Sequence, residues 1–484
     1  MRRLFLCTVS SMLLAGGLPE ELPLRTTLRA ETLRLPQNEA LGLIGFSGTA
    51  SFGPWYLGPG LYGAARGQRG GFFTFGLEGG GRGRPFPTLP LELEGGVFVG
   101  GGGGASAPQG GGLMLRPHLG AAFVLGAARL GLELSRVTFP NGGIDSTQVA
   151  LTLAFTSQGL WMPEAASRQS FEGPVRWGER SLEPELIRVE ATSASRTRTG
   201  TSQAPLTLAG LTSARDLGGP WFSYLAADGA AGGSSAGYAQ ALGGLGLRLP
   251  LAGPLGLEAR LGAGLGGGGD LDTGGGFLVA GEGSLTLGTG AWRGMAGVGI
   301  LRAPGGAFTG RTATFRVSHR FATARPWAGG EPLATFDLDG WRVGSGVLVY
   351  RQARRTTGAS GDVQLITLRA DRMLSRGFYL TGEAGSATGG GAGGYSTGLA
   401  GVGFETPALA RQRLFAEVAL GAAGGGGLAT GGGRLTSLRA GWRLALPQGL
   451  GLDATAGRVR GPRGGLDAPT LGLGLHVRFQ ALSH

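Results

Sequence analysis

The sequence predicts an all-β fold, an antiparallel transmembrane β-barrel built from three repeats of about eight strands each. Glycine accounts for 102 of the 484 residues. This density argues against long helices, because each interior glycine costs a helix about 1 kcal/mol. Apolar and polar residues alternate in runs of roughly 8 to 12 residues, the length that a tilted transmembrane strand needs. A glycine cluster between two such runs occurs three times, about 160 residues apart, so most of the chain consists of three copies of one repeat unit.

The glycine clusters lie at residues 101–112, 266–276 and 424–433. Each cluster separates two alternating runs, and we therefore predict that each is the tip of a β-hairpin. A repeat of this length is too long for one coil of a solenoid.

Each repeat can be divided into eight strands in the same order. The first strands lie at 27–35, 185–192 and 341–352, and the second at 41–52, 205–215 and 363–374. The third strands open on the aromatic pairs Trp55-Tyr56, Trp221-Phe222 and Phe378-Tyr379, and the fourth lie at 72–79, 238–249 and 395–405. The fifth strands lead into the glycine clusters at 91–99, 255–265 and 414–421, and the sixth leave them at 113–125, 277–287 and 435–446. The seventh and eighth form a hairpin over a Pro-Gly-Gly type turn at 136–145, 300–310 and 458–467, and each repeat ends on a phenylalanine, at Phe155, Phe321 and Phe479.

A signal peptide is predicted at residues 1–17, because Arg2 and Arg3 precede an apolar run and small residues follow it at 15–17. The only cysteine, Cys7, lies in this segment, so the mature chain would have no thiol for disulfides, catalysis or metal binding. The remaining segments are repeat 1 at 27–155, a connector at 156–184, repeat 2 at 185–321, a connector at 322–334, repeat 3 at 335–479 and a tail at 480–484.

The alternation of side chains is clear in the strand at 91–99, where Leu91 and Leu93 face one side and Glu92 and Glu94 the other. A soluble sandwich would turn the apolar face inward, whereas a membrane barrel turns it towards lipid. The signal segment, the absence of other cysteines and the aromatic residues at strand ends favour the membrane barrel. Lipid also offers no partner for an open sheet edge, which favours a closed sheet.

The polar faces of the strands carry charged residues that a barrel would direct into its lumen. Such residues either bias the choice of ion in a pore or pair with one another and hold neighbouring strands together. The predicted lumen-facing charges are Glu92, Glu94, Arg116, Glu133, Glu258, Arg260, Glu282, Glu417 and Arg439.

Several other functions are not expected from this sequence. Ser396 lies in a G-x-S-x-G pattern, but a strand follows where a helix is needed, and repeat 2 has Ala239 in its place, so no enzyme is predicted. Glycine patterns of the dinucleotide-binding type follow from composition, so no cofactor is expected. His319 and His476 fall on opposite faces, which argues against a metal site. All 43 basic residues are arginines spread along the strands and loops, and no nucleic-acid partner is predicted.

Three segments resemble strands of porin-like outer-membrane β-barrel proteins of Gram-negative bacteria. They read WYLGPGLYG at 55–63, GFYLTGEAG at 377–385 and LGLHVRF at 473–479. The resemblance implies export to the cell outer membrane and contact with outer-membrane lipid and lipopolysaccharide. It also implies insertion by the barrel-assembly machinery, which reads an aromatic residue such as Phe479 on the closing strand, and connectors on the periplasmic side.

Two architectures agree with three eight-strand repeats. The first is one barrel of about 24 strands, wide enough for an aqueous channel. The alternative is three tandem eight-stranded barrels. We expect a passive, porin-like channel for small solutes, with a mild anion preference because the net charge is +12. The alternative function is a non-conducting structural, anchoring or surface-interaction barrel.

Overall fold

The computed structural model describes residues 20–163, 174–326, 331–332 and 337–483, so the predicted signal peptide lies outside the described residues. These residues form β-strands and two single-turn 3-10 helices, η1 (Pro36–Asn38) and η2 (Pro447–Gly449). No helix among them has the length and apolar character needed to cross a membrane.

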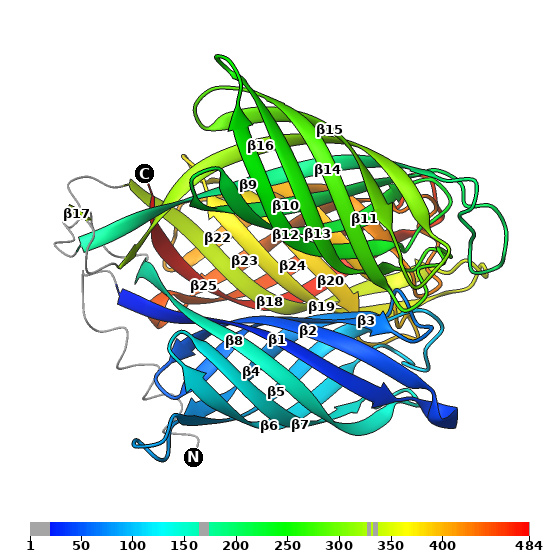
Figure 1. The fold of residues 1–484 in the computed structure, drawn as a ribbon, viewed down its shortest axis with the longest axis horizontal. Coiled ribbons are helices and arrows are strands. Elements are labelled where there is room, and N and C mark those ends of the chain that lie inside the picture. The colour runs from blue at the N-terminus through cyan, green and yellow to red at the C-terminus, as the bar shows by residue number, and fades with distance from the viewer. Residues whose placement is uncertain (1–19, 164–173, 327–330, 333–336, 484) are drawn as a thin grey trace.

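The strands form three closed antiparallel barrels of eight strands each (Figure 1). Barrel 1 consists of β1 (Glu20–Arg34), β2 (Ala40–Phe52), β3 (Trp55–Arg66), β4 (Phe73–Gly83), β5 (Leu91–Gly103), β6 (Met114–Leu125), β7 (Ala128–Thr138) and β8 (Asp145–Pro163). Barrel 2 consists of β9 (Pro174–Ala191), β10 (Leu206–Gly218), β11 (Trp221–Gly232), β12 (Ala239–Pro250), β13 (Leu255–Gly267), β14 (Phe277–Leu287), β15 (Trp292–Arg302) and β16 (Thr309–Pro326). Barrel 3 consists of β18 (Asp337–Arg354), β19 (Ser360–Met373), β20 (Phe378–Ala387), β21 (Ser396–Glu405), β22 (Gln412–Gly424), β23 (Arg434–Ala445), β24 (Leu450–Arg460) and β25 (Asp467–Ser483). The short β17 (Glu331–Pro332) pairs with the start of β9.

The prediction of one barrel of about 24 strands is wrong. The last strand of each repeat pairs with the first strand of the same repeat, as in Leu28↔Leu153, Ile187↔Thr314 and Val347↔Leu473. In both architectures every strand is hydrogen-bonded along both edges and the hairpins are the same. The alternation of apolar and polar residues alone therefore does not distinguish them. Closure within a repeat joins ends that are closer in sequence, which costs less chain entropy. The glycine-rich strands also allow the strong coiling that a small barrel requires.

The three barrels contact one another in a ring. The third strand of each barrel lies against the fifth strand of another: β3 against β13, β11 against β22, and β20 against β5. In Figure 1, barrel 1 is blue to cyan, barrel 2 is green, and barrel 3 is yellow to red. At the opposite end the final strands meet, since Phe479 pairs with Pro163 and Thr323 with Ser483. The repeated sequence therefore forms a single-chain assembly with approximate threefold symmetry.

The glycine clusters form the contacts between barrels. Gly112, Gly276 and Gly433 have φ angles of +99°, +96° and +88°. A Cβ atom on each would lie 2.4, 2.5 and 2.1 Å from the carbonyl oxygens of Ala387, Ala64 and Ala230 in a neighbouring barrel. Backbone hydrogen bonds cross the same contacts, from Gly70 N–H to the Gly274 carbonyl (2.8 Å) and from Gly394 N–H to the Gly102 carbonyl (3.0 Å). Glycine recurs there because two backbones meet without space for a side chain.

We call the end with these glycine tips the loop end, and the end where β1 starts and β25 finishes the terminal end. The connections at the loop end, such as 192–205 and 425–433, are longer than the turns at the terminal end, such as 53–54 and 126–127. Short turns on one side and longer loops on the other are typical of outer-membrane barrels.

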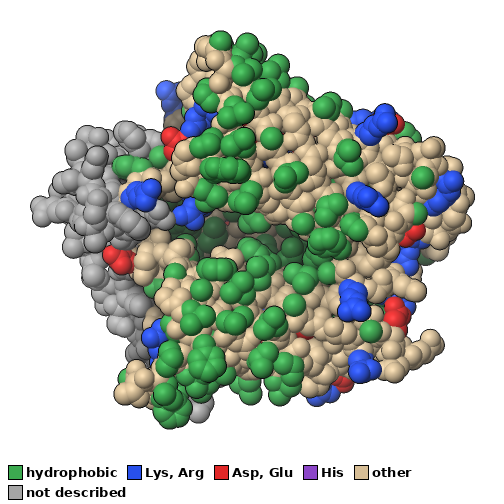
Figure 2. Space-filling model, in the orientation of Figure 1, with side chains coloured by type: hydrophobic (Ala, Val, Ile, Leu, Met, Phe, Trp, Pro, Cys, Tyr) green, Lys and Arg blue, Asp and Glu red, His purple; other side chains and the backbone are tan. Residues whose placement is uncertain are grey.

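The outer surfaces of the barrels are apolar, whereas charged side chains lie inside. Leu119, Leu261 and Leu473 are 69, 74 and 72 % exposed. Arg29 and Arg342 are fully buried. Figure 2 shows hydrophobic side chains across the middle of one face and most of the charged ones towards its ends. This distribution is the inverse of that in a soluble protein and fits a barrel surrounded by lipid.

Candidate functional site

The interior of barrel 1 is crossed by buried ion pairs. Arg29 of β1 lies 2.6 Å from a Glu78 oxygen on β4 and 3.1 Å from a Glu133 oxygen on β7. Because β1 pairs only with β2 and β8 among the described strands, these contacts span the lumen. Arg116 of β6 pairs with Glu31 at 2.9 Å and with Glu133 at 2.5 Å.

Barrel 2 repeats this arrangement with different residues. Arg260 of β13 lies 2.5 Å from both Glu183 of β9 and Glu258 of its own strand. Arg316 of β16 pairs with Glu185 of β9 at 2.6 Å and also with Glu282 of β14. Opposite strands are again joined by charged groups in the interior.

Barrel 3 contains a larger network of the same kind, in which Arg369 and Asp371 join the pairs of Arg439 to those of Glu405. Arg439 of β23 lies 2.7 Å from Glu383 of β20 and 2.9 Å from Glu417 of β22. Glu405 of β21 accepts from Arg342 of β18 at 2.7 Å, and also from Arg443 and Arg478 at 2.9 Å each.

Aromatic rings cover several of these guanidinium groups. The guanidinium carbon of Arg248 lies 4.0 Å from the ring centre of Phe222, and that of Arg443 lies 3.7 Å from the ring centre of Phe415. Cation–π contacts of this kind are worth about 0.5–2 kcal/mol. They hold the charged side chains in place while keeping them inside the barrel.

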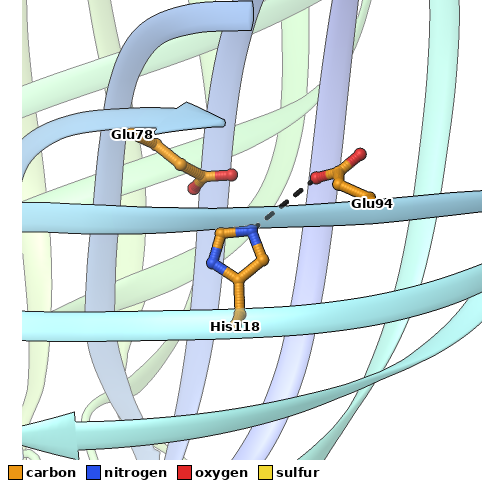
Figure 3. Close-up of side chains that lie close together, drawn as sticks. All are labelled: Glu78, Glu94 and His118. Atoms are coloured by element: carbon orange, nitrogen blue, oxygen red, sulfur yellow. Dashed lines mark ion pairs between the residues drawn. The ribbon is translucent and has the colours of Figure 1, made fainter. Parts of the chain in front are cut away.

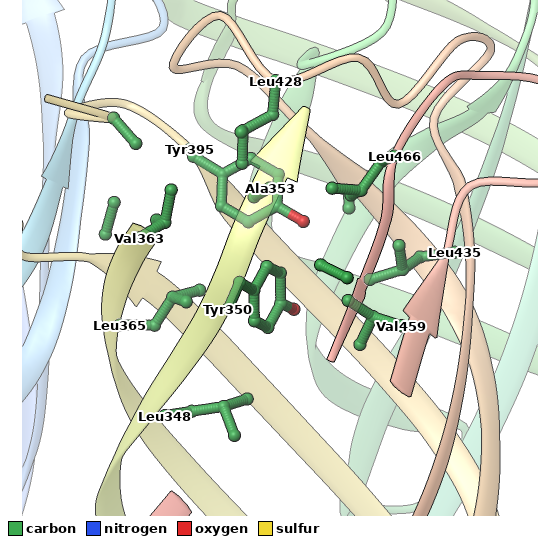
Figure 4. Close-up of a cluster of buried hydrophobic side chains, with 14 of the residues drawn as sticks. Leu348, Tyr350, Ala353, Val363, Leu365, Tyr395, Leu428, Leu435, Val459 and Leu466 are labelled. Atoms are coloured by element: carbon green, nitrogen blue, oxygen red, sulfur yellow. The ribbon is translucent and has the colours of Figure 1, made fainter. Parts of the chain in front are cut away.

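An apolar plug fills each barrel between its charged layer and its loop end. In barrel 3 it contains Tyr350, Tyr395, Leu435 and Val459, all at most 1 % exposed (Figure 4). The corresponding plugs include Leu33, Tyr62 and Phe72 in barrel 1, and Val189, Tyr238 and Leu278 in barrel 2. Each interior therefore has a charged layer and an apolar layer in series.

All nine residues predicted to face the lumen lie on the interior faces of strands and carry ion pairs. Glu133 contacts Arg116, Glu258 contacts Arg260, and Glu417 contacts Arg439. The other three are brought together with arginines that the prediction did not name. Glu92 and Glu94 share Arg25 at 2.6 and 3.1 Å, and Glu282 contacts Arg316.

The prediction named none of the buried arginines and carboxylates on the first strand of each repeat. These are Arg25, Arg29, Glu31, Glu183, Glu185 and Arg342. The same two-residue period marks them, because Arg25, Thr27, Arg29 and Glu31 alternate with Leu24, Thr26, Leu28 and Ala30.

One group in barrel 1 has donor atoms of the kind that bind metals. Ligand atoms of Glu78, Glu94 and His118 lie within 4.8 Å of one another (Figure 3). The His118 Nε2 atom is 3.0 Å from the Tyr56 hydroxyl and 3.8 Å from Glu94. Arg29 already pairs with Glu78 and Arg25 with Glu94. A cation would have to compete with these guanidinium groups, so this geometry favours ion pairing over metal binding.

Ser396, in the hydrolase-like pattern, begins β21. Its Oγ atom lies 3.1 Å from the Ser386 Oγ atom on β20. The segment after it continues as a strand rather than the helix that the nucleophile turn requires.

Arginines gather at the loop end, outside the plugs, and are more than twice as numerous there as carboxylates. They are Arg34, Arg66, Arg69, Arg136, Arg188, Arg196, Arg198, Arg302, Arg311, Arg351, Arg354, Arg355, Arg434, Arg458, Arg460 and Arg463. The carboxylates are Glu39, Asp145, Glu190, Asp270, Asp272, Asp362 and Asp467.

Closed antiparallel sheets, an apolar exterior and a charged interior are the features of a transmembrane type of β-barrel. No protein-family model matches the chain, and no curated protein matches it.

Solved structures similar to the chain include OccK11 (OpdR) of Pseudomonas aeruginosa, at 13 % identity and a TM-score of 0.23, covering 96 % of this chain and 97 % of that one. OccAB3 of Acinetobacter baumannii is 12 % identical with a TM-score of 0.21, covering 96 % and 99 %. The outer membrane protein OpdK of P. aeruginosa is 11 % identical with a TM-score of 0.22, covering 95 % and 99 %.

Proposed function

We propose that the protein is a porin-like channel of the outer membrane that passes small ions, with a preference for anions, through the charged interiors of its barrels. The observation that carries this proposal is the layer of charged side chains across every barrel, represented by Arg29, Arg260 and Arg439. Replacing buried ion pairs by apolar residues often leaves stability unchanged or raises it. A polar lining is what an ion path requires.

The size of the barrels limits what can pass. An eight-stranded barrel has an interior that side chains nearly fill, so only ions and water are candidates. An ion would advance when a pair such as Arg439 with Glu383 and Glu417 exchanges partners. The apolar plugs act as hydrophobic constrictions that gate by dewetting. We therefore expect a small conductance with long closed periods.

The excess of arginines at the loop end supports the anion preference. A mouth lined by one sign of charge concentrates ions of the opposite sign. Arg302, Arg311 and Arg463 have no ion pair among the described residues, so their charge is not neutralised locally. If the loop end is extracellular, these arginines would also face the phosphates of lipopolysaccharide, the lipid contact expected from the resemblance.

The test is current recording in a planar lipid bilayer under a potassium chloride gradient. The expected result is brief, small openings with a reversal potential shifted towards that of chloride. Tyr395→Ala, which shortens a plug residue, should make openings more frequent. Leu438→Ala on the lipid-facing surface is the matched control and should leave them unchanged. A reversal potential shifted towards that of potassium would contradict the anion preference.

A second candidate function is a non-conducting anchor or structural barrel. The plugs favour it, because Tyr62, Tyr350 and Tyr395 are fully buried inside their barrels. The same recordings separate the two candidates. An anchor would give no current in the wild type or in Tyr395→Ala, even when electrophoretic mobility shows that both are folded.

A further inference from the structure

The interior of barrel 3 contains a cavity of about 50 Å³. It lies against β18 and β25 and is bordered by Gly344, Gly346, Gly472 and Gly474. Polar side chains line its other sides, including Arg369, Arg439, Glu383, Asp453 and His476. A polar cavity needs only about 10–15 Å³ of such space to hold a water molecule, so this one is large enough to be hydrated.

The cavity exists because glycines replace large interior side chains. The interior face of β1 carries Arg25, Arg29 and Glu31, and that of β9 carries Glu183 and Glu185. On β18 the interior face instead has Gly344 and Gly346 between Arg342 and Leu348. Gly346 pairs with Gly474 and Leu348 with Gly472, so two adjacent strands lack side chains at this level.

The cavity lining combines apolar and charged side chains, and arginines outnumber carboxylates among the charged ones. Arg342, Arg369 and Arg439 line it, together with the carboxylates of Glu383 and Asp453. Arg439 is 5 % exposed, and its Nε–H finds no acceptor among the described residues. A buried donor without an acceptor is costly.

We propose that ions cross the protein through barrel 3, past the glycines that border its cavity, and that barrels 1 and 2 stay closed to ions. The proposal rests on the proposed channel function and specifies its route. Small inorganic anions such as chloride are the ligands that fit this lining. The plug containing Tyr350 and Tyr395 lies between the cavity and the loop end and is the gate on this route.

Cysteine substitution tests the route, because Cys7 is the only native cysteine and lies in the predicted signal peptide. Thr367→Cys places a thiol at the cavity. Thr27→Cys and Thr314→Cys are matched controls inside barrels 1 and 2, where both threonines are buried. A negatively charged methanethiosulfonate reagent is then added during current recording. Current through Thr367→Cys should be lost, and current through both controls should persist.

A second pair of variants fills the interior instead. A Cβ atom on Gly474 would lie 3.3 Å from its nearest neighbour, the Ser345 carbonyl oxygen. Gly120 in barrel 1 has similar room, with the Leu132 carbonyl oxygen at 3.2 Å. Gly474→Leu should abolish the current, whereas Gly120→Leu should preserve it. Electrophoretic mobility of unheated and heated samples verifies that each variant is folded.

The possible results separate the route from the function. If the reagent blocks the current through Thr27→Cys or Thr314→Cys, the assignment to barrel 3 is overturned and the channel function stays intact. The same conclusion follows if the reagent blocks the current through none of the three variants. Absence of current in the folded wild type and in Tyr395→Ala would overturn both.

Discussion

Replacing Gly276 by alanine should weaken the contact between barrels 1 and 2. Gly276 has a φ of +96°, and a Cβ atom there would lie 2.5 Å from the Ala64 carbonyl oxygen. A left-handed conformation costs an L-residue about 1–2 kcal/mol. Forcing a methyl group into a packed contact costs about 1–3 kcal/mol. The expected destabilisation is therefore about 2–5 kcal/mol.

Urea unfolding in lipid vesicles, followed by tryptophan fluorescence, measures this loss. The matched control is Gly283→Ala on β14 of the same barrel, where a Cβ atom would have no neighbour within 4 Å. That variant should be as stable as the wild type or slightly more so. Gly112→Ala and Gly433→Ala should behave like Gly276→Ala, because they occupy the same position in the other repeats. Equal stability of Gly276→Ala and Gly283→Ala would refute the interpretation of the glycine tips as contacts between barrels.

Three further predictions follow from the charged interior, the lipid-facing surface and the loop end. Arg29→Met leaves Glu78 without its ion-pair partner and removes one of the two partners of Glu133, so it should lower the unfolding free energy by about 3–5 kcal/mol. Arg29→Met with Glu78→Gln should lose less, and urea titration compares the two. Leu132→Arg should cost up to about 2–4 kcal/mol in vesicles if Leu132 faces lipid near the bilayer midplane, and a neutral effect would argue that this surface is solvated. The hydrogen bonds from Arg69 lower the pKa of Glu39, so this pair adds stability above the ordinary glutamate pKa and loses it as the pH falls through the lowered pKa. Arg69→Met should therefore have a lower unfolding midpoint than the wild type at pH 7, and the difference between the two midpoints should shrink in acid. A difference that does not change with pH would contradict the role of Glu39.

The sequence allowed the strands and their two faces to be predicted, because each strand alternates with a period of two. Glu94 and Leu93 are adjacent in sequence, yet one lies in the interior with its carboxylate among arginines and the other on the outer surface. The glycine clusters were also recognisable as hairpin tips, since each separates two such runs. Their part in holding barrels together was not predictable, because it depends on residues such as Ala64 that lie about 200 residues away in the chain.

The partner of each closing strand could not be predicted from the pattern. Leu153 of β8 faces outward, and an apolar residue of β1 or of β9 would match it equally well. Only the pairing with Leu28 closes an eight-stranded barrel. The contents of the lumens depend on that choice, since a small barrel brings Arg29 within reach of Glu78 and Glu133, whereas a large one would leave water between them.

Closure of each repeat on itself is tested most directly by cross-linking between strands. Leu28→Cys with Leu153→Cys joins register partners of β1 and β8, and directly opposite residues lie about 4.5–5.5 Å apart. Leu153→Cys with Leu186→Cys joins β8 to β9, which would be neighbours in one large barrel. Three closed barrels predict a rapid disulfide between residues 28 and 153 and none between 153 and 186. A disulfide between 153 and 186, with none between 28 and 153, would contradict them.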